Sequence, residues 1–329
     1  MTRPAPAVSI VIPVYRRQQE LDRALRALAL QTCKDFEVVV VDDGSPEPVS
    51  AAEGARLGLA VRLLRAEPNG GANRARNMGV AAASAPLIAF LDSDDLWFPE
   101  KLARQLQAFA AMEAAQRDRT ILACRCLVWG ETKLFARPSR APAGAYASAE
   151  AALCAPGALV QTSALMLSTR LARSLPFDES LPTHHEPDLI LRLYAAGGVV
   201  VMLPDVLAVW DDRQRPGRFS AGKVAATEAW WAEVERRSPS AAWRHWRRAD
   251  EVQRLRAEGG ALLAGLARLA RRHGAAAALK SAVQLAAPGR YRALQERRFA
   301  ALSGHALDAG EVQAFHDLLR RVEEPPAAP

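Results

Sequence analysis

The first hundred residues alternate short apolar runs with stretches of helical periodicity, and this alternation constrains the fold more than any other feature. The apolar runs are VSIVIPV (8–14), FEVVVVD (36–42), AVRLLR (60–65) and PLIAFLD (86–92). Between the first two runs Leu21, Leu25 and Leu28 recur at helical spacing, and a small-residue helix is predicted over 72–83. Continuously apolar strands separated by helices are typical of a mostly parallel sheet covered on both faces. The sequence therefore predicts an α/β fold.

The pattern after Pro99 is less regular. A helix is predicted from there to about Gln116, and residues 130–147 indicate a loop or irregular hairpin. A further helix is predicted over 186–197, and strands are predicted over TILACRCLVW (120–129), QTSALMLS (161–168), VVVMLP (199–204) and VLAVW (206–210). From about residue 222 only helical patterns remain. We therefore expect one domain over 1–221, a helical region over 222–323 and a disordered tail over 324–329.

Composition sets outer bounds on the class of protein. The chain has 329 residues, of which half are hydrophobic and about a quarter charged, as in globular proteins with a sizeable core. No signal peptide is predicted, and no apolar stretch approaches the roughly 18 residues of a membrane-spanning helix. The four cysteines lack zinc or disulfide spacing, so we expect free thiols and a cytoplasmic location. The net charge of +7 favours an anionic partner, which nucleic acid, an anionic bilayer or a phosphorylated substrate would satisfy equally.

Two acidic clusters directly follow predicted strands. Asp42 and Asp43 close the second run, and LDSDDLW places Asp92, Asp94 and Asp95 behind the fourth. Ligands of open parallel sheets bind outside the carboxyl ends of the strands, so two central strands would bring both clusters to one site. Such carboxylates suit Mg²⁺ or Mn²⁺, whose other ligands are substrate phosphates and water. The alternative is that they are turn and helix-capping residues.

The first strand runs into VYRRQQEL, which lacks the glycine-rich loop of a dinucleotide site. Instead VSIVIPVYRR, QTCKDFEVVVVDDGS and NGGANRARNMGVAAASAPLIAFLDSDDLW, in this order, resemble the nucleotide-binding half of family 2 glycosyltransferases with the GT-A fold. The resemblance covers residues 7 to about 105. It implies a donor-binding half there and an acceptor half over about 106–221 of a catalytic domain.

The resemblance also implies roles for individual residues. Pro13 and Tyr15 would lie beside the nucleobase, and Asp43 would accept a hydrogen bond from it. Asp92 would lie near the ribose and the metal, and Asp94 would bind the metal on the sugar-nucleotide diphosphate. The latter pair forms the DXD motif of the family.

Arg76 and Asn77 match the ARN signature of the family, which implies that they line the donor site. The alternative from the residues alone is a structural role at the start of the helix predicted over 72–83.

An inverting transferase needs a carboxylate that takes the proton from the acceptor hydroxyl. The segment FDESLPTHHEPDLILRL (177–193) resembles the acceptor-side motif of the family, which makes Glu186 the implied base and Asp188 a second acid. The family more often has Asp where Glu186 stands, so Asp188 could serve instead. Both residues also suit the first turn of a helix, with Pro187 at its first position.

Less specific features lie towards the C-terminus. Asp211 or Asp212 could replace a late histidine ligand of some relatives, and Arg215, Arg218 and Ser220 are interpreted as a loop over the diphosphate.

The helical region carries paired arginines and four tryptophans, which are Trp230, Trp231, Trp243 and Trp246. WRHWRR (243–248) could lie on an anionic membrane, or the tryptophans could pack on the catalytic domain and leave the arginines solvated. No nucleic-acid recognition module is apparent, so we expect no nucleic-acid partner.

These observations predict an inverting glycosyltransferase that depends on Mn²⁺ or Mg²⁺. It would transfer a sugar from a nucleotide-diphosphate sugar to a hydroxyl of a glycan or lipid-linked acceptor, in bacterial cell-surface polysaccharide biosynthesis. The expected location is the cytoplasm, with peripheral contact at the inner face of the cytoplasmic membrane as an option. The alternatives are a nucleotidyltransferase that forms the sugar nucleotide and a non-catalytic sugar-nucleotide-binding protein.

Overall fold

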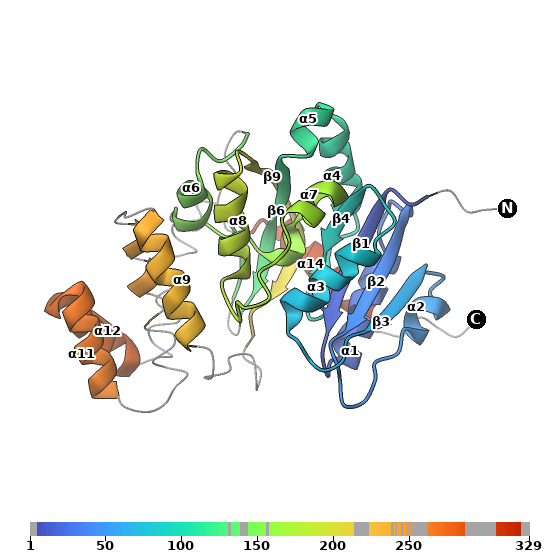
Figure 1. Cartoon of the computed structure of the whole chain (residues 1–329). Coiled ribbons are helices and arrows are strands. Elements are labelled where there is room, and N and C mark those ends of the chain that lie inside the picture. The colour runs from blue at the N-terminus through green and yellow to red at the C-terminus, as the bar shows by residue number, and fades with distance from the viewer. Residues whose placement is uncertain are drawn as a thin grey trace.

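The computed structural model describes residues 5–130, 133–138, 144–155, 158–213, 224–237, 240, 242–244, 246–248, 251, 262–286 and 307–323. Within these residues, nine strands form one sheet in the order β3-β2-β1-β4-β8-β6-β9-β5, with β7 paired to β6. Helices lie on both sides of the sheet (Figure 1). The predicted α/β fold is confirmed.

The strands are β1 (Val8–Val14), β2 (Phe36–Asp42), β3 (Val61–Arg65), β4 (Leu87–Phe90), β5 (Leu96–Trp97), β6 (Thr120–Trp129), β7 (Leu134–Arg137), β8 (Met166–Ser168) and β9 (Val199–Asp211). The helices are α1 (Gln18–Ala29), α2 (Ala52–Arg56), α3 (Ala72–Ala82), α4 (Lys101–Ala110), α5 (Ala114–Arg117), α6 (Ala149–Cys154), α7 (Thr169–Ser174), α8 (His185–Ala195), α9 (Val224–Arg237), α11 (Leu262–His273), α12 (Ala275–Ala286) and α14 (Ala309–Glu323), with a 3-10 turn η1 (Thr162–Ala164).

The first half of the sheet is entirely parallel. Strand β1 lies between β2 and β4, and β3 extends the sheet beyond β2. Both faces of β1 are buried: Ile10 and Ile12 pack in the core that contains α1, whereas Val11 packs in the core on the other face, with Val80 of α3. Burial on both faces explains why these strands are apolar without alternation.

The second half of the sheet is mixed, because β8 joins β4 and β6 antiparallel while β9 runs parallel to β6. The two strands expected over 199–204 and 206–210 are one strand, β9. Its register against β6 shifts where Cys124 and Arg125 face it, at Pro204. Proline has no N–H for the ladder, so an irregularity accommodates it without ending the strand.

Two other boundaries differ from expectation. The helix predicted from 99 to 116 is divided into α4 and α5, and only the last three residues of the predicted strand over 161–168 belong to a strand, β8. The preceding residues form η1, in which Gln161 accepts a hydrogen bond from the amide of Ser163. Polar side chains that bond nearby backbone compete with a strand ladder in this way.

Helices α9, α11 and α12 lie to one side of the sheet, whereas α14 returns to it (Figure 1). Phe315, Leu318 and Val322 of α14 pack in a core cluster with residues of α1, β5, β6 and β9. The predicted boundary between residues 221 and 222 and the tail over 324–329 lie outside the described residues and stay predictions. Among the described helices, none combines the length and the apolar character needed to cross a membrane. The four cysteines are free thiols, as expected.

Candidate active site

The carboxyl end of β2 places Asp43 against a glycine-rich segment. Its Oδ1 accepts a hydrogen bond from the Gly70 amide at 2.9 Å, and its Oδ2 accepts from the Gly71 amide at 2.8 Å and from Asn69 Nδ2 at 2.9 Å. Gly71 is the N-cap residue of α3. Asp43 thus fixes the start of α3, and its predicted contact with a nucleobase stays a prediction.

Gly44 permits this close approach. Its φ is +71°, and a Cβ built there would lie 2.7 Å from the backbone nitrogen of Asn69. A side chain at this position would therefore strain the backbone and separate the two loops. The neighbouring Asp42 is buried and accepts hydrogen bonds from the amides of Ser45 and Val49, so it stabilises the turn and does not face the site.

The segment after β4 lies on the other side of β1, because the Leu91 amide donates to the Val11 carbonyl. Here Arg76 Nη2 lies 2.6 Å from Asp92 Oδ1. Arg76 is buried, its Nη1 donates to Asn73 Oδ1, and its guanidinium lies 5.2 Å from the centroid of the Phe177 ring. A buried arginine of the predicted ARN signature therefore pairs with Asp92, the first carboxylate of the predicted DXD motif.

Asp94 is held by the segment that follows β1. Arg17 Nη1 lies 2.6 Å from Asp94 Oδ2, and Arg23 Nη2 donates to the Asp94 carbonyl at 3.3 Å. Neither arginine was predicted. A signal for Arg17 is present in YRRQQEL (15–21), because a basic residue shortly after a central strand lies at the same sheet edge as the acidic cluster that follows the neighbouring strand.

Asp95 is the structural member of the acidic segment. It is buried, its Oδ2 accepts from Gln161 Nε2 and Ser163 Oγ at 2.6 Å each, and its Oδ1 accepts from the Asp211 amide at 3.1 Å. Burial, followed by the charges of Asp94 and Asp92, raises the pKa of Asp95 well above its ordinary value.

The 3-10 turn η1 connects this donor side to the acceptor side. Ser163 Oγ accepts a hydrogen bond from the Asp92 amide at 2.9 Å. The adjacent Thr162 donates to Glu186 Oε1, from Oγ1 at 2.6 Å and from its amide at 3.2 Å. Consecutive residues of one turn therefore hold the DXD segment and the candidate base. This connection between segments far apart in sequence was not predicted.

The Glu186 carboxylate is surrounded by hydrogen-bond donors and basic side chains. Its Oε2 lies 3.2 Å from His185 Nε2. Burial by itself raises the pKa of Glu186, but His185, Thr162 and Arg76 lower it by more, so the pKa lies well below the ordinary range. Arg76 thus contacts Asp92 and also acts electrostatically on Glu186. The predicted donor and acceptor carboxylates share one buried cation.

Two of the predicted residues point elsewhere. Asp188 Oδ2 accepts from Arg192 Nε at 2.7 Å, and its Oδ1 accepts from Trp230 Nε1 at 3.3 Å. Asn77 bonds the backbone amide and carbonyl of Phe177 and the Glu179 carboxylate, all at 2.9 Å. In this geometry both residues hold neighbouring segments together, and their predicted roles in the site stay predictions.

The remaining candidates flank the edge of the sheet. Pro13 is buried in β1, whereas Tyr15 is exposed with the Arg16 guanidinium 5.0 Å from its ring centroid. Asp211 is buried in an ion pair with Arg213 at 2.8 Å, which leaves it poorly placed as a substitute metal ligand. The predicted loop of Arg215, Arg218 and Ser220 lies outside the described residues.

The donor set fits a divalent cation that relies on substrate oxygens. The side chains of Asp92 and Asp94 are 22% and 13% exposed, and each is balanced by one arginine. In the part of the chain that the structure describes, no three His, Cys, Asp or Glu side chains group closely enough to hold a metal ion by themselves. Mg²⁺ and Mn²⁺ commonly take one or two protein carboxylates and complete their coordination with phosphates and water.

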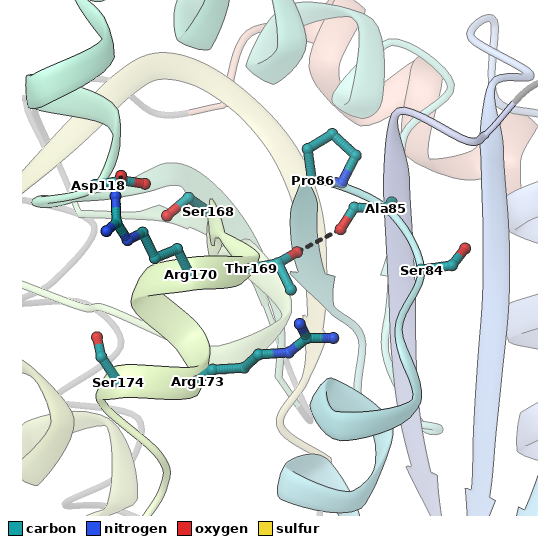
Figure 2. A pocket seen from close by; sticks show the side chains of 9 residues that line it. All are labelled: Ser84, Ala85, Pro86, Asp118, Ser168, Thr169, Arg170, Arg173 and Ser174. Carbon is teal, nitrogen blue, oxygen red and sulfur yellow. Dashed lines mark hydrogen bonds and ion pairs between the residues drawn. The ribbon is translucent and has the colours of Figure 1, made fainter.

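A separate shallow pocket lies at the opposite edge of the sheet. Figure 2 shows its lining side chains, among them Arg170, Arg173 and Thr169, whose Oγ1 donates to the Ala85 carbonyl. Ser84 to Pro86 immediately precede β4, whereas Asp92 follows it. This pocket is therefore distant along the strand from the candidate active site.

The tryptophans of the helical region pack inward. Trp230, Trp231 and Trp243 are buried with Leu181 in one cluster, and Trp246 is half-buried against it. Arg247 is also buried, in ion pairs with Glu228, Glu235 and Glu251. The aromatic residues thus follow the packing alternative, and they offer no support to the predicted membrane contact.

The parallel first half of the sheet and the acidic segments at its carboxyl edge are arranged as in a GT-A type fold. Residues 9–124 match the model of glycosyl transferase family 2. This match covers β1 except for Val8, and it contains β2 to β4 and the segment Asp92–Asp94.

Similar proteins agree with this match. The amylovoran biosynthesis glycosyltransferase AmsB of Erwinia amylovora is 28% identical over 230 residues, which are 69% of this chain and 76% of AmsB. The succinoglycan biosynthesis protein ExoW of Rhizobium meliloti is 40% identical over 114 residues, which span only 32% of this chain and 35% of ExoW. The crystal structure of S. aureus TarS 1-349 in complex with UDP-GlcNAc has a TM-score of 0.52 and 18% identity, over 96% of this chain and 81% of that chain.

Proposed function

We propose that this protein is a metal-dependent inverting glycosyltransferase. It transfers a sugar from a nucleotide-diphosphate sugar to a hydroxyl of a glycan or lipid-linked acceptor, in the assembly of a bacterial cell-surface polysaccharide. The main support for this proposal is that two features connect the DXD segment with Glu186. The turn η1 forms hydrogen bonds with Asp92 and with Glu186, and Arg76 pairs with Asp92 and acts electrostatically on Glu186. Similarity to proteins of amylovoran and succinoglycan biosynthesis supports the product class, and the UDP-GlcNAc complex of TarS supports the donor class.

Glu186 acts as the general base in this proposal. Its lowered pKa keeps the carboxylate ionised at neutral pH, so it can accept the proton of the acceptor hydroxyl as that oxygen attacks the sugar carbon. Thr162 and His185 hold the carboxylate, and Arg76 balances the charges of Asp92 and Glu186. Asp188 is the second candidate for this role, but Arg192 and Trp230 already bind it.

Asp94 and Asp92 would hold Mn²⁺ or Mg²⁺, which would neutralise the charge that develops on the leaving diphosphate. Arg17 pairs with Asp94, and in this proposal it would also face that diphosphate. The nucleotidyltransferase alternative is not favoured, because the similar proteins named by activity are glycosyltransferases. The proposal includes a cytoplasmic location with peripheral membrane contact. The buried tryptophan cluster is not the surface that would make this contact.

The decisive experiment compares Glu186→Gln with Asp188→Asn. Transfer from UDP-GlcNAc and other nucleotide sugars is measured together with donor binding by calorimetry in Mn²⁺. We expect Glu186→Gln to reduce transfer by about 10²–10⁴-fold while donor binding is retained, because only the proton acceptor is lost. Asp188→Asn should retain most of the transfer activity.

The reverse result would move the base to Asp188, and unchanged transfer in both variants would remove this carboxylate segment from the mechanism. The variant Asp94→Asn tests metal ligation separately. It should weaken donor binding in Mn²⁺ but have little effect on binding in EDTA, and an equal loss in both conditions would contradict metal ligation by Asp94.

A further inference from the structure

The residue that precedes α8 has an unusual backbone conformation. His184 is its N-cap residue and has φ +62°, and only one other non-glycine residue in the described part of the chain, Arg16, has a positive φ. A left-handed conformation is unfavourable for a residue with a Cβ and persists where surrounding contacts impose it. His184 lies two positions before Glu186, so whatever imposes this conformation also sets where α8 begins.

Helix α9 supplies the contacts that hold His184 in this conformation. The His184 ring stacks on Trp230, with centroids 4.7 Å apart and planes at 20°, and its edge meets Trp231 at 5.6 Å. On its other side His184 Nδ1 lies 2.9 Å from Thr183 Oγ1, which lies 3.2 Å from Thr227 Oγ1 of α9.

Trp230 also contacts the residue on the far side of the candidate base. Its Nε1 donates to Asp188 Oδ1 at 3.3 Å. One indole of α9 therefore contacts positions −2 and +2 relative to Glu186, while Glu186 itself faces Thr162 and His185. An indole that bridges two points of a helical first turn restricts the turn between them.

We propose that Trp230 is a positioning residue for the acceptor-side base, and that α9 thereby belongs to the catalytic apparatus. The side chain stacks on His184 and binds Asp188, and so keeps Glu186 within hydrogen-bond distance of Thr162. This inference rests on the proposed role of Glu186. It assigns the first part of the helical region a function in transfer, separate from contact with a membrane.

The test compares Trp230→Leu and Trp230→Phe with the matched control Trp243→Leu, all in the full-length chain. Trp243 is buried in the same cluster, at 1% exposure against 7% for Trp230, and its ring contacts are to Trp231 and Trp246. Trp230→Leu should lower kcat by about 10–100-fold with the KM for donor within about two-fold, because small displacements of a catalytic group are costly. Trp230→Phe keeps a ring for His184 and should recover part of the loss, whereas Trp243→Leu should keep kcat near the wild-type value.

Hydrogen exchange of the backbone amides over 183–190 gives a readout independent of activity. Trp230→Leu should speed exchange there more than Trp243→Leu does, at matched global stability. Equal exchange and equal kcat losses in the two Leu variants would overturn the positioning role. If the wild-type protein transferred no sugar, the proposed function would fail, while the exchange data would still decide whether Trp230 holds this turn.

Discussion

At the scale of single residues, buried charges are arranged in two different ways. Arg76 is buried, but it forms an ion pair with Asp92 and acts electrostatically on Glu186. Lys101, in contrast, is fully buried on α4, and its Nζ has no hydrogen-bond partner, with the Trp97 ring centroid 3.3 Å away. Burial lowers the pKa of Lys101 to about 7. A buried amine without a hydrogen-bond partner carries a desolvation cost that a buried arginine in an ion pair partly recovers.

Lys101 therefore makes stability depend on pH. Between about pH 7 and pH 10 the unfolded chain binds the proton that the folded chain has lost, so the free energy of unfolding should rise with pH, by up to about 1.4 kcal/mol per unit. Below about pH 7 both states bind the proton and this contribution to the slope vanishes. Urea unfolding of Lys101→Met against the wild type should show that the substitution removes the slope. Parallel stability curves for the two proteins would show that Lys101 does not titrate there.

At the scale of elements, the short turn η1 contributes more to the site than its three residues suggest. Its Ser163 binds both the Asp92 amide and the Asp95 carboxylate, and its Thr162 binds Glu186. The sequence predicts a strand over QTSALMLS, yet the polar side chains bond locally and the strand begins only at Met166. The acidic segments themselves were predictable, because strand ends are visible in the sequence and their common edge follows from parallel pairing.

The turn gives a prediction for the pH dependence of transfer. Thr162→Val removes the hydroxyl that donates to Glu186, so the pKa of Glu186 should rise and the acid limb of kcat/KM should move to higher pH. Thr162→Ser retains a hydroxyl and should restore the wild-type profile. The pH–rate profiles of the three proteins measure this, and coincident acid limbs would separate Thr162 from the ionisation of the base.

At the scale of the whole molecule, the last described helix belongs to the core of the catalytic sheet. Phe315 of α14 meets Trp129 of β6 edge-to-face at 5.2 Å between centroids, and Arg26 of α1 donates to the Val322 carbonyl at 3.0 Å. The predicted division into a catalytic domain and a helical region over 222–323 follows composition. It does not anticipate that the end of that region packs against α1 and β9.

Phe315→Ala should consequently lower the free energy of unfolding of the entire protein by about 3–5 kcal/mol, because it leaves a cavity in a core shared with α1. Leu279→Ala on α12, where the side chain is 70% exposed, is the control and should change stability by less than about 0.5 kcal/mol. Denaturant unfolding followed by circular dichroism provides the measurement. An unaltered unfolding midpoint in Phe315→Ala would show that α14 folds independently of the sheet.

The sequence by itself determined the α/β class, the parallel donor half and the acidic segments at its carboxyl edge, because these depend on local periodicity and on residue types at strand ends. Only the tertiary structure decided which carboxylates share Arg76, that Thr162 holds Glu186, and that Asp188 and Asn77 instead bind neighbouring segments. It also decided that the tryptophans of α9 pack on the residue before α8. These contacts join positions dozens of residues apart, and no local pattern encodes which distant side chain will neutralise or orient a buried charge.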